Sequence, residues 1–313
     1  MTPMQVVRRI AQAALVLLAT FTLAFLLLSA LPGDAVQARY ANPDLGLSAE
    51  QIEQIRNDLG ADRPLPLQYL LALTGFLTGN LGYSVNSGTA VATMIRHALP
   101  GTLVLALVGF LAALLLASAV ALLASLPRWG WLRRAVRSLP ALMVSMPAFW
   151  LGIMLIQVLS FRLGLVPVIG ASPAQQLVLP AMTLAVPIAA PLAQVLVRSI
   201  DEVLGQSFVT VVRARGAGEA WLFFRNVLRN ALLPALTMAG ILFGELVGGA
   251  VVTEAVFGRN GLGSLTVQAV ANRDTPVILA VVVISATAYV LINLAVDLLY
   301  PVLDPRLRRS NAA

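Results

Sequence analysis

Few residues in this sequence could catalyse a reaction. The 313 residues include no cysteine and a single histidine, His97. Without cysteine the chain has no disulfide, no thiolate zinc site and no cysteine nucleophile. A lone histidine is more typical of an ordinary loop residue than of a catalytic base, because catalysis needs several groups that converge on one point. We therefore expect no catalytic residue and no metal site in this chain, which would not be an enzyme.

The basic residues indicate whether the chain could bind a nucleotide through a P-loop. All 21 of them are arginine, so the sequence has no lysine. A P-loop holds nucleotide phosphates with the lysine of its Gly-Lys-Ser/Thr sequence. The chain therefore cannot be a conventional P-loop ATPase, and we expect it to bind no cofactor itself. Any ATP must be handled by a partner.

Composition indicates an all-α integral membrane protein. Hydrophobic residues make up 59% of the chain, charged residues only 11%, and the mean hydropathy is +0.87. A water-soluble fold would have too little polar surface to cover such a core. A membrane helix needs about 20 mostly apolar residues. The sequence offers six such stretches, at about 10–30, 102–125, 139–160, 177–197, 234–256 and 276–299.

The arginines predict the orientation of these six spans. If the N-terminus is cytoplasmic, fourteen arginines lie inside and seven outside, and the inside loops are the shorter ones. The positive-inside rule then predicts that both termini are cytoplasmic. The net charge of +7 is thus a signal of topology, with contact to anionic membrane lipid as a second consequence, and it does not indicate nucleic-acid binding.

The spans divide the chain into four segments. They are a cytoplasmic tail with the first span (1–30), an extracytoplasmic segment (31–101), a five-helix core (102–299) and a cytoplasmic tail (300–313). Within the second segment, Ser48 and Gln51 predict a capping box at the start of a helix. The segment could cap the outer ends of the spans or bind a partner, and the sequence leaves both open.

Acidic and small residues in the fifth span predict a translocation pathway. Glu245 lies near the middle of the span, and an acid at that depth must face protein or water. Glu254 lies nine residues further on, almost on the opposite helix face, so both line one path only if the helix deforms at Gly248 and Gly249. These four residues are the candidate pathway, with a paired structural acid as the alternative for Glu245.

Between the fourth and fifth spans lies a cytoplasmic loop, 198–233, that is too polar to span and too regular to be disordered. Val209 and Val212, and then Trp221, Phe224 and Leu228, recur at helical spacing. Gly216 and Gly218 separate two helical pieces. The second piece would have an aromatic side and a basic side. It could lie on the inner leaflet or insert into a groove on a soluble partner, and physical reasoning alone favours neither.

The loop and a series of other motifs resemble those of one transporter family. The loop contains "FVTVVRARGAG" at 208–218 and "RNALLP" at 229–234. Elsewhere the chain has, in order, "LPGD" (31–34), "LGADRPLPLQYL" (59–70), "GNLGYS" (79–84), "GGAVVTEAVF" (248–257), "GLGSLTVQAVANRD" (261–274) and "VDLLYPVLDPRLR" (296–308). This series is similar to the ABC importer permeases of the dipeptide/oligopeptide branch, and specifically to the first of their two permease subunits. Thr210, Val211 and Val212 stand where the wider family has Glu-Ala-Ala, so the role of that glutamate is not carried over.

The resemblance implies a type I ABC importer permease fold in the bacterial cytoplasmic (inner) membrane, and ATP-driven import of di- or oligopeptides or similar solutes. It implies four kinds of partner: a homologous second permease subunit, two ABC ATPase subunits that hold ATP and Mg, an extracytoplasmic substrate-binding protein, and membrane lipid. The ATPase-docking residues would be Arg213, Ala214, Arg215, Gly216, Ala217, Gly218, Glu219, Trp221 and Phe224.

Two other classes of protein compete with this interpretation. An ion-coupled secondary transporter or channel subunit would be indicated by paired intramembrane charges in corresponding positions of two halves, and we find no such repeat. A membrane-embedded enzyme is disfavoured by the lack of histidine, cysteine and clustered acids.

Overall fold

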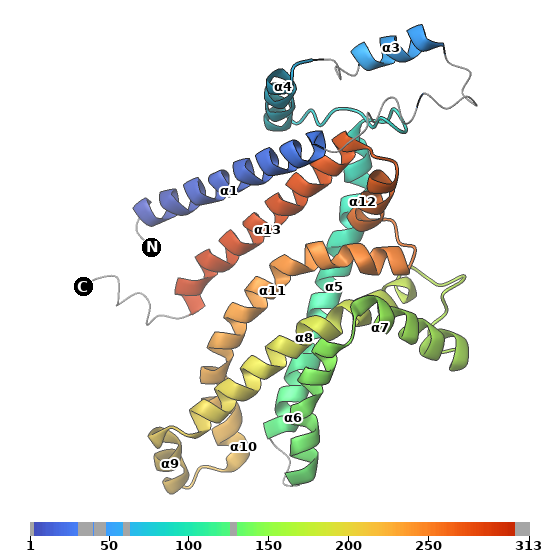
Figure 1. Ribbon diagram of the computed structural model, residues 1–313. Coiled ribbons are helices and arrows are strands. Elements are labelled where there is room, and N and C mark those ends of the chain that lie inside the picture. Colours follow the sequence, from blue (N-terminus) through green and yellow to red (C-terminus); the bar gives the residue numbers. More distant parts are fainter. Residues whose placement is uncertain (1–2, 31–39, 41–47, 59–62, 126–129, 304–313) are drawn as a thin grey trace. The chain divides into compact units, whose positions relative to one another are not determined.

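The computed structural model of the protein describes residues 3–30, 40, 48–58, 63–125 and 130–303 (Figure 1). These residues are mostly helical and contain no β-strand, apart from an isolated bridge between Tyr83 and Ala90. The helices are α1 (Pro3–Ser29), α3 (Ala49–Asp58), α4 (Leu65–Thr78), α5 (Val91–Ser125), α6 (Gly130–Ser145), α7 (Ala148–Leu155), α8 (Gln175–Leu204), α9 (Ser207–Ala214), α10 (Glu219–Leu222), α11 (Leu228–Val256), α12 (Leu262–Ala271) and α13 (Thr275–Leu303). Two π-helical stretches, η2 (Ile156–Arg162) and η3 (Phe223–Val227), follow α7 and α10. The all-α prediction is confirmed over this part of the chain.

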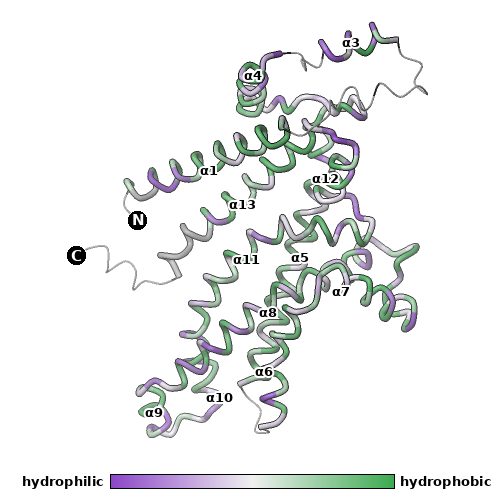
Figure 2. The backbone as a smooth tube through the Cα atoms, viewed as in Figure 1, coloured by the Kyte–Doolittle hydropathy of each residue, from purple (hydrophilic) through white to green (hydrophobic). Residues whose placement is uncertain are grey.

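Five of the six predicted spans are confirmed as helices long and apolar enough to cross a membrane. They are Val7–Ser29, Val91–Ser125, Gln175–Leu204, Glu219–Leu246 and Thr275–Ala295. The fourth of these begins inside the predicted loop and overlaps the predicted span 234–256 only in part, although α11 itself continues to Val256. The hydrophobic residues of the five helices appear in Figure 2 as long green stretches. The six-span count holds if the remaining bent pair is one span.

The third predicted span, 139–160, is a bent pair of helices and not one straight helix. Gly130–Ser145 and Ala148–Arg162 are separate helices that meet at an angle of 106°. Pro147 precedes α7 with extended backbone (φ −61°, ψ 134°). A proline disfavours helical backbone at the residue before it, here Met146, and cannot donate the next helical hydrogen bond. These two effects explain why the helix breaks there.

The described chain forms two compact units. These units are defined by which residues pack together, so each combines parts of more than one of the four segments named above. One unit holds residues 103–257 and the end of α13 from Leu291. Its core is rich in alanine, which lets helix backbones approach closely. α5, α8 and α11 each contribute buried alanines to one cluster, among them Ala117, Ala189 and Ala235. In α8, 61% of the most apolar window is buried within the chain, and the three internal prolines lie in a continuous helix.

The second unit holds residues 2–102 and 258–290. Phe21, Phe25, Tyr69 and Phe76 form an aromatic cluster between α1 and α4. The predicted capping box of α3 is confirmed, because Gln51 N donates to Ser48 Oγ (3.2 Å) and Ser48 N to Gln51 Oε1 (2.8 Å).

One buried acid joins two segments of this second unit that are distant in sequence. Asp274 is 3% exposed and accepts hydrogen bonds from the Ser84 hydroxyl and from the backbone N–H of Val85 (3.2 Å). It therefore fixes the turn before α5 against the start of α13.

Candidate functional site

The predicted cytoplasmic loop is a pair of short helices at one end of the α8–α11 pair (Figure 1). α8 ends at Leu204, and only Gly205 and Gln206 separate it from α9. α10 then runs through η3 directly into α11. Both ends of the loop therefore join long helices with almost no linker.

Gly216 ends α9, as the sequence predicted. Its backbone is left-handed (φ +83°), and a Cβ at this position would meet nothing within 4 Å. Gly216 N donates to Arg213 O (2.9 Å) and Ala217 N to Val212 O (3.4 Å), the two bonds of a Schellman motif. The position therefore needs glycine for its backbone conformation and not for space.

An ion pair closes the turn that Gly216 makes. Arg213 donates from Nε and from a second nitrogen to the two carboxylate oxygens of Glu219, at 2.8 and 3.0 Å. Both side chains are exposed at this turn, so the pair orients α10 relative to α9 more than it stabilises the fold.

The loop has one face toward the core and one toward the surroundings. Val209, Leu222, Phe223 and Val227 are buried in the alanine-rich cluster, at 5% exposure or less. The outer face carries exposed apolar side chains, namely Val211, Trp221 and Phe224, at 49%, 52% and 55% exposure. These exposed apolar side chains are available for contact with membrane lipid or with a partner.

The predicted separation of an aromatic and a basic side was wrong. The guanidinium of Arg225 lies over the Trp221 ring, 5.8 Å from its centre. Arginine and aromatic side chains therefore share the outer face. The four-residue α10 gives way to the wider turns of η3, so faces drawn for a regular α-helix do not hold across residues 219–227.

The structure brings the nine predicted docking residues together on this loop. Eight are exposed and Ala217 is half-buried. Sequence reasoning missed Val211, although Val209 and Val212 define the inner face of α9 and place Val211 on the outer one. The role of the nine predicted residues in docking stays a prediction. Among the described residues, no group of three histidines or acids lies close enough to hold a metal ion.

The predicted pathway residues occupy two environments on α11. Glu245, Gly248 and Gly249 are exposed, and a Cβ added at either glycine would meet open space. Glu254 is 1% exposed and therefore lies inside the packed unit. Figure 1 shows that α11 bends along its length, yet Glu254 does not share the exposed face of the other three.

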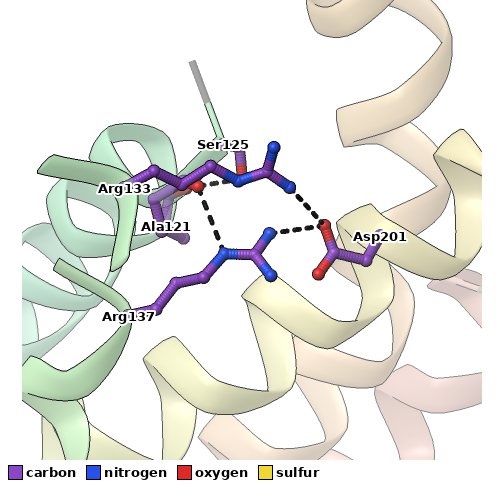
Figure 3. Close-up of polar contacts among 6 residues, drawn as sticks. Ala121, Ser125, Arg133, Arg137 and Asp201 are labelled. Carbon is purple, nitrogen blue, oxygen red and sulfur yellow. Dashed lines mark hydrogen bonds and ion pairs between the residues drawn. The ribbon is translucent and has the colours of Figure 1, made fainter. Parts of the chain in front are cut away.

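Sequence reasoning also missed a polar cluster beside the loop. Arg133 and Arg137 on α6 meet Asp201 in the last turn of α8 (Figure 3). The two ends of the Arg137–Asp201 pair are 64 residues apart in sequence, so no local pattern indicates it.

Two family models match almost the whole sequence. Residues 117–309 match the model described as binding-protein-dependent transport system inner membrane component. Residues 4–106 match the model for the N-terminal part of such membrane components.

Curated relatives and solved structures agree with these matches. The chain is 37% identical to the glutathione transport system permease protein GsiC of Escherichia coli (strain K12) over 286 residues, 91% of this chain and 92% of the relative. It is 37% identical to the protein of the same name from Salmonella choleraesuis (strain SC-B67) over 292 residues, 93% of this chain and 94% of the relative. Among solved structures, one of the MetNI methionine ABC transporter in an inward-facing conformation is similar to this chain, with a TM-score of 0.58 and 21% sequence identity. The match covers 67% of this chain and 96% of the matched chain in that structure. At that identity the structure shows a shared fold alone.

Proposed function

Because the chain belongs to the family of binding-protein-dependent transport system inner membrane components, we propose that it is one of two permease subunits of an ATP-driven importer. It is a multi-pass protein of the bacterial inner membrane. The proposed partners are a homologous second permease subunit, two ABC ATPase subunits that carry ATP and Mg, and an extracytoplasmic substrate-binding protein.

The loop around Gly216 carries the proposal. It presents Val211, Trp221 and Phe224 among arginines, on a turn fixed by the Schellman motif and the Arg213–Glu219 pair. An apolar surface of this kind, already ordered in the single chain, can bind a groove on an ATPase subunit with little further ordering. The nine predicted docking residues would form this contact.

The mechanism follows from the way the loop joins the long helices. When the ATPase subunits close on ATP, they would move α9 and α10 as a rigid body. Because α8 and α11 continue from the loop with almost no linker, they would swing with it and open the pathway alternately to the two sides of the membrane. Glu245, Gly248 and Gly249 would line that pathway, since they form an exposed face of α11.

The proposed substrates are di- or oligopeptides or related small peptide-like solutes. Support comes from the relatives named for glutathione transport, because glutathione is itself a small peptide. The exposed face of α11 combines one acid with glycines, which suits solutes that carry an ammonium group and side chains of varied size.

Reconstitution tests the proposal. The complete transporter, with its ATPase subunits and binding protein, is placed in vesicles, and uptake of radiolabelled dipeptides and of glutathione is measured with and without ATP. Uptake that requires both ATP and the binding protein is the expected result. Uptake that instead follows an ion gradient without ATP would contradict it.

A further inference from the structure

The polar cluster of Arg133, Arg137 and Asp201 joins three helices (Figure 3). It lies next to α9 and α10, which are called the docking loop below. Arg137 Nη2 donates to Asp201 Oδ1 at 2.8 Å, and Arg133 Nη2 lies 3.8 Å from the same oxygen. Arg137 Nε also donates to the backbone carbonyl of Ala124, at 3.5 Å. Arg137 therefore connects the end of α5, the middle of α6 and the end of α8.

The ends of α5 and α8 explain where Arg137 lies. The C-terminal turn of a helix carries a partial negative charge, which disfavours an acid and favours a cation. Asp201 is in the last turn of α8, and its own backbone carbonyl accepts the N–H of Gly205 at 3.1 Å. Ala124 is in the last turn of α5. Arg137 thus lies between two helix ends and a carboxylate, all of which attract it.

The cluster is not what holds α6 against α8. Val136 and Met143 of α6 and Leu196 and Ile200 of α8 belong to one cluster of buried side chains, which provides the packing. The side chains of Arg137 and Asp201 are 32% and 38% exposed, and ion pairs that open to solvent add little to stability. The pair is therefore better suited to fixing direction than to stabilising the fold.

The position of Asp201 couples this cluster to the docking loop. Only two residues lie between the end of α8 and the start of α9 at Ser207. On either side of this junction, Val203 and Val209 are buried in the same hydrophobic cluster. A displacement of α9 must therefore move the last turn of α8. Packed side chains and ion pairs between rigid helices are the contacts that pass such a displacement on.

We propose that Arg137 and Asp201 are positioning residues that transmit the movement of the docking loop to α5 and α6, so that these helices move together with α8. The inference rests on the proposed function, because it needs an ATPase that moves the loop. It extends that function by giving a specific polar contact the task of passing the movement sideways from α8.

Removal of the charge, and its conservative replacement, test this inference in the complete transporter. In vesicles, dipeptide uptake per ATP hydrolysed should fall by about fivefold or more in Asp201→Asn, the low end of measured coupling between sites. The ATPase subunits should copurify as before. Arg137→Ala should lower uptake per ATP in the same way, whereas Arg137→Lys, which keeps a cation near Asp201 and the Ala124 carbonyl, should retain most of it. Glu202→Gln is the control. Glu202 pairs with Arg198 one turn away on the same helix, and both side chains are well exposed. This substitution should leave uptake per ATP hydrolysed unchanged.

Each result decides the matter. Unchanged uptake per ATP in Asp201→Asn, or a loss in Arg137→Lys as large as in Arg137→Ala, would overturn the inference. Loss of the ATPase subunits from Asp201→Asn and Arg137→Ala would also overturn it, because the cluster would then serve folding and not transmission. If the unaltered transporter itself shows no ATP-dependent uptake, the proposed function fails first and the inference with it.

Discussion

At the scale of single residues, two glycines two positions apart have different tasks. Gly216 has φ +83°, whereas Gly218 has φ −66°, a value that any residue adopts. A Cβ would meet nothing at either position. The pair therefore separates the effect of backbone conformation from the effect of side-chain volume at the same turn.

The first prediction uses this pair. Gly216→Ala should destabilise the turn by about 1–2 kcal/mol, the cost of a left-handed alanine. It should thereby lower the amount of ATPase subunit that copurifies with the permease. Gly218→Ala should leave copurification unchanged. Equal effects of the two substitutions would show that the left-handed turn is not required for docking.

The second prediction concerns Glu245, whose side chain is exposed on α11. Because Glu245 is exposed, Glu245→Leu should leave assembly of the transporter normal while uptake falls severalfold. Glu254→Leu replaces a buried acid and should instead reduce the yield of assembled complex. Uptake kinetics and size-exclusion yield measure the two effects. Normal uptake by Glu245→Leu would remove this residue from the pathway.

At the scale of elements, hydropathy predicted five spans because each is a long apolar run within one helix. It did not show the bend in the third span, where Pro147 separates two apolar helices. The docking loop was predicted in part. Glycine spacing located the turn, but the face that carries Leu222, Phe223 and Val227 was missed because a π-helical stretch shifts the register there.

The third prediction separates the two faces of the loop. Trp221→Ala combined with Phe224→Ala should weaken binding of the ATPase subunits and leave the melting temperature of the isolated permease almost unchanged, because both rings are half exposed. Phe223→Ala empties a buried site and should cost about 3–5 kcal/mol of stability. A melting curve and a copurification assay distinguish the two outcomes. A double variant that melts early but still docks would contradict the assignment of the outer face.

At the scale of the whole molecule, the chain has the features of one subunit of a larger complex. It has no lysine for a P-loop, and its first span buries only 6% of its most apolar window within the chain, which leaves that helix for lipid or another subunit. Contacts such as Arg137–Asp201 link residues far apart in sequence, so only the folded structure could show them. Composition and motifs predicted the family, whereas the transmission contacts depend on packing.

The central claim is that the loop around Gly216 docks into an ATPase subunit, and site-specific crosslinking tests it most directly. The chain has no cysteine, so Arg215→Cys provides a single reactive site on the loop, and Thr74→Cys provides an exposed control on α4. In membranes that contain the whole transporter, a short bifunctional reagent should join position 215, and not position 74, to the ATPase subunit. Crosslinks from position 215 to phospholipid alone would contradict the account.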